Sequence, residues 1–169
     1  PAHAEPGPAP GERVDRARAE KLERALDHAR RAGDLREEAI IVALLAQALY
    51  FGPTPVEQAI ERCERFLSDV TGDRSLGAAI GSTLAGLHAM RGDFDEARRL
   101  WAEAHKLYEL LGLGFRRAVR SLIPASIETL AGDYDAAERE LRWGYETLER
   151  MGAESPQATI GSFLAETVY

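Results

Sequence analysis

Glycines recur at a nearly constant interval along this chain. Over the 169 residues, successive members of the series are 19 or 20 positions apart. The residues between them are good helix formers, and a glycine just past the last turn of a helix supplies the left-handed backbone conformation that other residues avoid. Each interval therefore predicts one helix with its turn, and two intervals make a repeat of about 40 residues. The series is Gly33, Gly52, Gly72, Gly92, Gly112, Gly132 and Gly152.

Aspartates directly after four of these glycines predict where helices begin. A carboxylate oxygen at this position can accept a hydrogen bond from a free backbone N–H of the first turn. Thr54, followed by Pro55 and Glu57, has the pattern of a capping box with proline at the first helical position. No alternation typical of strands competes with this assignment. The aspartates are Asp34, Asp73, Asp93 and Asp133, and the predicted helices span 12–32, 35–50, 55–71, 74–91, 94–111, 115–131, 134–151 and 156–169.

The second helix of each pair carries apolar residues at steps of three and four, which predicts one apolar face. Ordering a backbone residue costs about 1–2 kcal/mol, and fully burying a large apolar side chain stabilises by about 1.5–3 kcal/mol, so an isolated helix pair is not stable. Pairs stacked side by side bury each stripe, and the sequence therefore predicts an all-α fold, an α-solenoid. The stripes are Val56, Ala59, Cys63, Phe66 and Val70; Phe94, Ala97, Trp101, Ala104, Tyr108 and Leu111; and Tyr134, Ala137, Leu141, Gly144, Leu148 and Met151.

Composition restricts the partners and the location that we expect. With 21 basic and 28 acidic residues, the formal charge is −7, which repels phosphate backbones and anionic lipids, so we expect no direct binding to nucleic acid or a membrane. The sequence contains no long apolar run and no signal-peptide pattern, which predicts a cytoplasmic location. Residues 1–11 are rich in proline and glycine and predict an interdomain linker or the boundary of an expressed fragment. Residues 12–169 predict a single domain, part of a longer polypeptide.

The segment Leu84–Ala104 resembles the signature of tetratricopeptide repeats, with Gly92, Asp93 and Phe94 at the turn between its two helices. The segment Leu130–Gly144 shows the same pattern. The resemblance covers residues 34–169 and implies a right-handed α-solenoid. Its repeat exceeds the usual length of about 34 residues. In this respect it is similar to MalT-like bacterial regulators and to multidomain proteins that join a nucleotide cyclase or DNA-binding domain to a signalling ATPase.

The resemblance also implies which residues face a partner, because the first helix of each pair lines the concave wall of such a solenoid. This wall consists of small and apolar residues and suits an apolar helix or peptide. Flanking repeats or a second copy of the chain are alternative occupants of the wall. With two arginines added, the expected partner-binding residues are Ala39, Val42, Ala46, Ala79, Ser82, Gly86, Arg116, Val119, Arg120, Leu122 and Ser126.

Two features interrupt the regular pattern near these arginines. Pro124 lies inside a predicted helix, where proline lacks an N–H and its ring collides with the carbonyl four residues earlier, that of Arg120. We therefore expect a bend, either as an irregularity of a curved solenoid or as a widened groove that exposes this carbonyl. Arg116, Arg117 and Arg120 form a cationic cluster suited to carboxylates or phosphates. It predicts a solvated face or a docking point for a neighbouring acidic helix.

The sequence contains no nucleotide-binding, metalloprotease or nucleophile motif. We therefore expect no catalytic residue, cofactor or metal. Cys63 belongs to an apolar stripe and is expected to be buried, and His88 is expected to pack inside or at the edge of the groove. Trp101 and the tyrosines are expected to be core residues.

These observations favour a non-catalytic protein-interaction module, the sensor or scaffold part of a bacterial signalling or transcriptional regulator. The expected partner is a protein or peptide, with other domains of the same polypeptide included. The alternative is a small-ligand sensor whose groove binds a metabolite, as the MalT-like resemblance implies. A homodimerising spacer is a third hypothesis.

Overall fold

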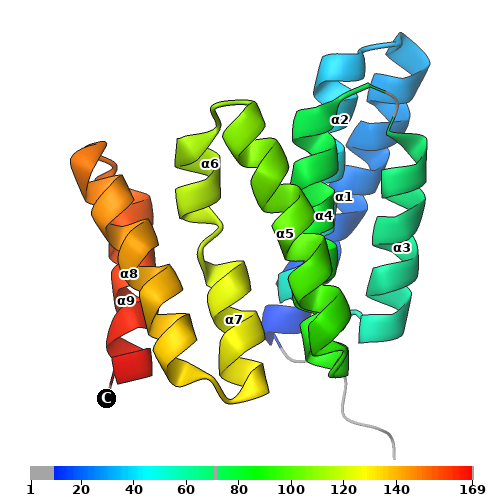
Figure 1. The fold of residues 1–169 in the computed structure, drawn as a ribbon. Coiled ribbons are helices and arrows are strands. Elements are labelled where there is room, and N and C mark those ends of the chain that lie inside the picture. The colour runs from blue at the N-terminus through cyan, green and yellow to red at the C-terminus, as the bar shows by residue number, and fades with distance from the viewer. Residues whose placement is uncertain (1–9, 71, 169) are drawn as a thin grey trace, which may run out of the picture. The chain divides into compact units, whose positions relative to one another are not determined.

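The computed structural model describes residues 10–70 and 72–168, and over these residues the chain is helical without any strand. The predicted all-α class is thereby confirmed. Figure 1 shows the helices, which are joined by short turns. They are α1 (Pro10–Ala32), α2 (Leu35–Phe51), α3 (Val56–Asp69), α4 (Arg74–Arg91), α5 (Phe94–Leu110), α6 (Gly114–Val119), α7 (Leu122–Ala131), α8 (Tyr134–Arg150) and α9 (Glu154–Val168).

Helix ends differ from the predicted ends by at most two residues. The helix predicted over 115–131 is not continuous, because the structure divides it into α6 and α7. Of the linker predicted over residues 1–11, positions 1–9 lie outside the described residues, and Pro10 and Gly11 belong to α1.

The glycine series terminates helices in two different ways. Six of its seven members have positive φ angles between 65° and 91°, the left-handed conformation that the spacing predicts. Gly52 is different, with φ −90° and ψ 177°. Its N–H donates to the Ala48 carbonyl at 2.9 Å, and a Cβ at this position would lie 2.5 Å from the same oxygen. At Gly52 the close approach of the backbone, rather than a left-handed turn, requires glycine.

Three of the four predicted aspartate caps form hydrogen bonds. Asp34, Asp73 and Asp133 each accept a hydrogen bond from the backbone N–H three residues later, at 2.9–3.0 Å. Asp93 makes no such bond. Its carboxylate instead accepts a hydrogen bond from Arg91 Nε at 2.7 Å. The prediction of a side-chain cap at Asp93 is therefore wrong, because the preceding arginine competes for the carboxylate.

The chain divides into two compact units, 1–55 and 56–169, and the domain predicted over 12–169 spans both. In the first unit, α1 and α2 form an antiparallel pair. Arg30 Nε of α1 donates to Glu38 Oε1 of α2 at 2.8 Å. Leu26 and Ala29 are buried on α1, and Leu45 and other apolar residues are buried on α2.

The second unit contains α3 to α9, which lie side by side with neighbours antiparallel, and α6 and α7 follow one another along one column (Figure 1). α4 contacts α3, α5 and α7, and α8 contacts α6, α7 and α9. The α4–α5 pair therefore packs against α7 of the α7–α8 pair. One cluster of its core joins α8 and α9 to α6 and α7, and consists of Ala118, Ala125, Ala137, Leu141, Leu148 and Ile160.

The predicted stripes are buried at their centres but not at their ends. Ala59, Ala97 and Ala137 are fully buried. Tyr134 and Met151, at the two ends of the α8 stripe, are 59% and 52% exposed. The prediction that the tyrosines are core residues is thus wrong for Tyr134, the exposed first residue of α8, and Tyr169 lies outside the described residues.

Candidate partner-binding site

The joint between α6 and α7 positions the cationic cluster. α6 ends at Val119, and Arg120 at the joint has φ −92° and ψ 9°. Pro124 has no N–H to donate to the Arg120 carbonyl. The N–H of Ile123 donates to that oxygen instead, at 2.9 Å. The helix is therefore interrupted close to the position that Pro124 predicts, but the alternative with a free Arg120 carbonyl is wrong.

Arg116 and Arg120 both reach across to α4. Arg116 Nη1 donates to Ser75 Oγ at 2.7 Å, and Arg120 Nη1 donates to Ser82 Oγ at 3.0 Å, with Thr83 Oγ1 at 3.4 Å. The two arginines are four residues apart, one helical turn, which explains why both face the same neighbouring helix. Arg116 is exposed and Arg120 is half-buried.

The hydroxyl groups that receive Arg120 are oriented by their own helix. Ser82 Oγ and Thr83 Oγ1 each donate to the Ala79 carbonyl, at 2.9 and 3.1 Å. Because a hydroxyl has a single proton, this leaves lone pairs free to accept from the guanidinium. Tyr108 Oη lies 3.4 Å from Ser82 Oγ. All of these partners are neutral, and neither Arg116 nor Arg120 has an ion pair with a carboxylate among the described residues.

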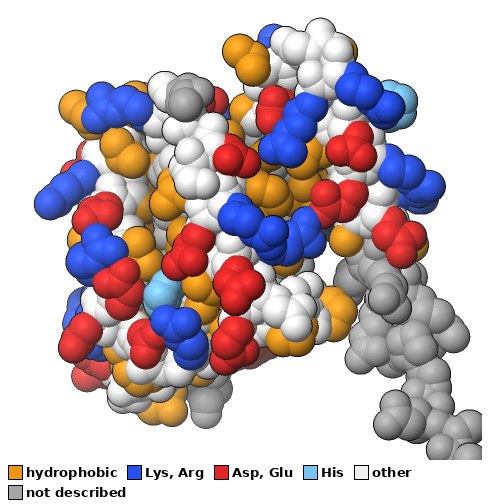
Figure 2. Space-filling model, turned by 90° about the vertical axis from the view of Figure 1, so that its right-hand side faces the viewer, with side chains coloured by type: hydrophobic (Ala, Val, Ile, Leu, Met, Phe, Trp, Pro, Cys, Tyr) orange, Lys and Arg blue, Asp and Glu red, His pale blue; other side chains and the backbone are white. Residues whose placement is uncertain are grey.

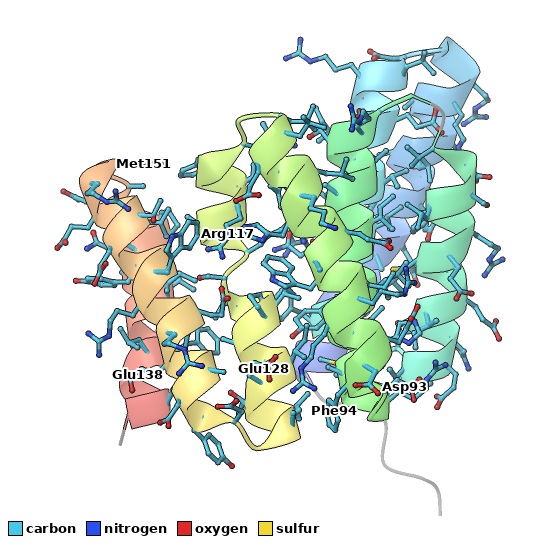
Figure 3. All side chains as sticks on the ribbon, in the orientation of Figure 1. Asp93, Phe94, Arg117, Glu128, Glu138 and Met151 are labelled. Carbon is cyan, nitrogen blue, oxygen red and sulfur yellow. The ribbon has the colours of Figure 1, made fainter. Side chains whose placement is uncertain are left out.

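Several other arginines of the second unit have carboxylate partners. Arg98 on α5 donates twice to Glu128 on α7, at 2.9 and 2.6 Å, and Glu128 is labelled in Figure 3. These bonds raise the pKa of Arg98. Over the face shown in Figure 2, acidic and basic side chains are likewise interspersed. Arg116 and Arg120 therefore differ from Arg98, because they place uncompensated positive charge against hydroxyl groups.

Arg117, the third member of the cluster, faces α8 instead. Its guanidinium lies over the ring of Trp143, 3.2 Å from the centroid, and its Nη2 donates to Glu140 Oε2 at 3.2 Å. Arg117 is only 8% exposed, and burial lowers the pKa of its guanidinium. The prediction of a solvated face is wrong for this residue. It is labelled on α6 in Figure 3.

The expected concave wall is divided by the structure. On α4, Ala79, Ser82 and Gly86 are buried, so these positions do not present an open surface. On α6 and α7, Val119, Leu122 and Ser126 are half-buried, and Ser126 Oγ donates to the Leu122 carbonyl at 2.7 Å. Of these predicted wall residues, the structure brings Arg120 and Ser82 into contact through a hydrogen bond. The α2 residues belong to the first unit, where Ala39 is half-buried and Val42 and Ala46 are buried.

The remaining chemically versatile side chains serve packing. Cys63 is a free cysteine with no exposed surface, and burial raises the pKa of its thiol to about 12. His88 is buried, with Nδ1 3.2 Å from Arg91 Nη2 and 3.6 Å from Asp93 Oδ2. Among residues 10–70 and 72–168, no group of three or more His, Cys, Asp or Glu side chains is arranged to hold a metal ion.

Within the described ranges, none of the helices combines the length and apolar character needed to cross a membrane. No protein-family model matches the chain, and no curated protein matches it significantly. Its relation to tetratricopeptide repeats therefore stays a prediction.

Proposed function

We propose that this chain is a non-catalytic protein-interaction module and that it binds its partner over α6 and α7. The partner is a protein or peptide, and the module belongs to a larger cytoplasmic signalling or transcriptional regulator, as the resemblance to MalT-like repeats implies. In this proposal the second unit is part of a right-handed α-solenoid of the tetratricopeptide type.

The packing of the second unit supports the solenoid. α4 contacts both α5, its partner in one antiparallel pair, and α7 of the next pair. In the same way α8 contacts α7 within its pair and also α9, which follows it. Such contacts between consecutive pairs are what a stack of helical repeats requires, because a single pair cannot bury its apolar face.

One observation carries the binding role. In a chain of formal charge −7, Arg116 and Arg120 keep their charge without a carboxylate partner among the described residues, and hold it against the hydroxyls of Ser75 and Ser82. Arginine is strongly favoured where carboxylates are recognised, because its planar group offers several donors in a fixed arrangement. Val119 and Leu122, which are close to these arginines in the sequence, are half-buried and pack against the core cluster of α6 to α9.

A peptide-display selection with the full chain tests the proposal. Peptides enriched on the native chain are expected to lose binding to the R116Q/R120Q double variant and to keep binding to R139Q. Arg139 is a matched control, since it is an exposed arginine on α8 without a carboxylate partner among the described residues. If no peptide is enriched, or if enriched peptides bind both variants equally, the proposed interaction face is wrong.

A further inference from the structure

We propose that Arg116 and Arg120 bind two carboxylates on one acidic helix of a partner protein, and that these carboxylates lie two helical turns apart. This inference rests on the proposed interaction function and specifies the chemistry of the partner. It concerns the face of α6 that points toward α4.

Both arginines have guanidinium N–H groups that donate no hydrogen bond to a described residue, and this supports binding of an anion. A guanidinium has five N–H donors. Arg116 uses Nη1 on Ser75, and Arg120 uses Nη1 on Ser82 and Thr83. The other donors of both groups have no partner among the described residues, and the hydroxyls do not neutralise the positive charge. A carboxylate that approaches from outside can therefore pair with either arginine without first displacing a resident acid.

The hydroxyl groups of Ser75 and Ser82 on α4, which anchor the two guanidinium groups, determine how far apart the two charges lie. Ser75 and Ser82 are seven residues apart on one helix, which places them on the same face at a separation of about 10 Å. The Cα atoms of Arg116 and Arg120, four residues apart, are separated by only about 6 Å along α6. The two side chains must therefore diverge to reach their hydroxyls, and the guanidinium groups are held farther apart than the backbone positions from which they start.

This separation selects among anionic partners. A single phosphate or carboxylate is much smaller than the distance between the anchors, so it contacts only one arginine unless the other leaves its hydroxyl. Two glutamates seven residues apart on a helix are also about 10.5 Å apart and share one face. Such a pair matches both guanidinium groups at once.

The test uses synthetic helical peptides with capped ends, built from Ala, Gln and Leu. The probe carries two Glu seven residues apart, and its controls carry two Gln at those positions, or two Glu three residues apart. Binding is followed by the NMR signals of the arginine side-chain Nε–H groups, which single substitutions assign to Arg116 and Arg120. Inorganic phosphate is titrated in parallel.

We expect the seven-residue probe to shift both arginine signals to saturation. The Gln peptide should bind at least about tenfold more weakly, and the three-residue peptide about fivefold more weakly, since each exposed ion pair contributes up to about fivefold. Added salt should reduce the difference. R116Q and R120Q should each weaken binding of the probe about fivefold. If R120Q is too unstable to measure, R116Q alone provides the test, because it alters an exposed side chain. R139Q should leave binding unchanged.

Equal binding of the Glu and Gln peptides, or of the two Glu spacings, would overturn the inference. So would a phosphate titration that moves both signals as strongly as the probe, or a probe that produces no saturating shift. The display selection separates this result from the broader proposal. Selected peptides that depend on the two arginines but lack paired acids would leave the interaction function in place and refute the acidic-helix partner.

Discussion

The guanidinium of Arg117 lies over the indole ring of Trp143, with its central carbon 3.2 Å from the ring centroid. This contact joins α6 to α8, and the bond from Arg117 to Glu140 joins the same two helices. One residue earlier, Arg116 joins α6 to α4 through Ser75. Consecutive arginines therefore connect the short helix α6 to two different helices, α4 and α8.

W143A tests the strength of this contact. Loss of the cation–π interaction with a buried guanidinium and of part of the apolar contact should lower the free energy of unfolding by about 2 kcal/mol, measured by urea denaturation. Y134A removes another aromatic residue of α8, but Tyr134 is 59% exposed. Its cost should stay below about 0.5 kcal/mol. Similar losses in the two variants would show that the Arg117 contact contributes nothing specific.

Gly144 is required by the close packing of α8 against the α6–α7 joint. A Cβ at this position would overlap Ser121 Oγ and lie 3.1 Å from the Ala118 carbonyl oxygen. G144A should therefore destabilise the protein by about 1–3 kcal/mol. Gly77 is a matched control within α4, where a Cβ meets nothing within 4 Å. G77A should be neutral or stabilise by up to about 1 kcal/mol in the same denaturation experiment. If G77A lowers the free energy of unfolding more than G144A does, the close packing of α8 against the α6–α7 joint is contradicted.

The two aspartates at equivalent turns should respond differently to substitution. Asp133 accepts a hydrogen bond from the Ala136 N–H, whereas Asp93 does not cap its helix. D133A should lower the free energy of unfolding by about 1 kcal/mol. D133N should keep most of the stability of the native chain, because an amide oxygen can also accept this hydrogen bond. If D133A and D133N are equally destabilised, the cap is not the cause.

Asp93 should instead contribute to the pH dependence of stability. The hydrogen bond from Arg91, followed by the positive charge of Arg91 and the contact with His88, lowers the pKa of Asp93 below its ordinary value of 3.8. A carboxyl with a lowered folded-state pKa stabilises the protein above the unfolded pKa, and this contribution is lost as the pH falls through the folded pKa. D93N and R91Q should both show a flatter stability profile between pH 5 and pH 2 than the native chain. A profile unchanged in both variants would refute the assignment.

Cys63 should be unreactive while the protein is folded. Its thiol is fully buried, and burial raises its pKa to about 12, so the reactive thiolate is scarce at neutral pH. A thiol reagent such as Ellman's reagent should label the native protein only at the rate of its opening, and should label it rapidly in urea. Fast labelling without denaturant would show that α3 opens readily or that Cys63 is accessible.

The positions of helices and turns could be predicted from the sequence because their signals are local. Gly92 and Gly132 adopt the predicted left-handed conformation, and Asp34 forms the predicted cap. Pro124 predicts an interruption because the missing N–H is a property of the residue itself. The candidate site was predicted in part, since Arg116 and Arg120 stand out in an acidic chain as a cationic cluster.

Only the tertiary structure decided where these side chains point. Arg116, Arg117 and Arg120 look alike in the sequence, but Arg117 is buried on Trp143 of α8 while the other two reach hydroxyls on α4. The expected wall on α4 proved to be buried at Ser82 and Gly86. Helix formation depends on neighbours within a few residues. Burial and ion pairing depend on groups far away in the chain, such as Ser82 and Arg120, which come together only when the helices pack.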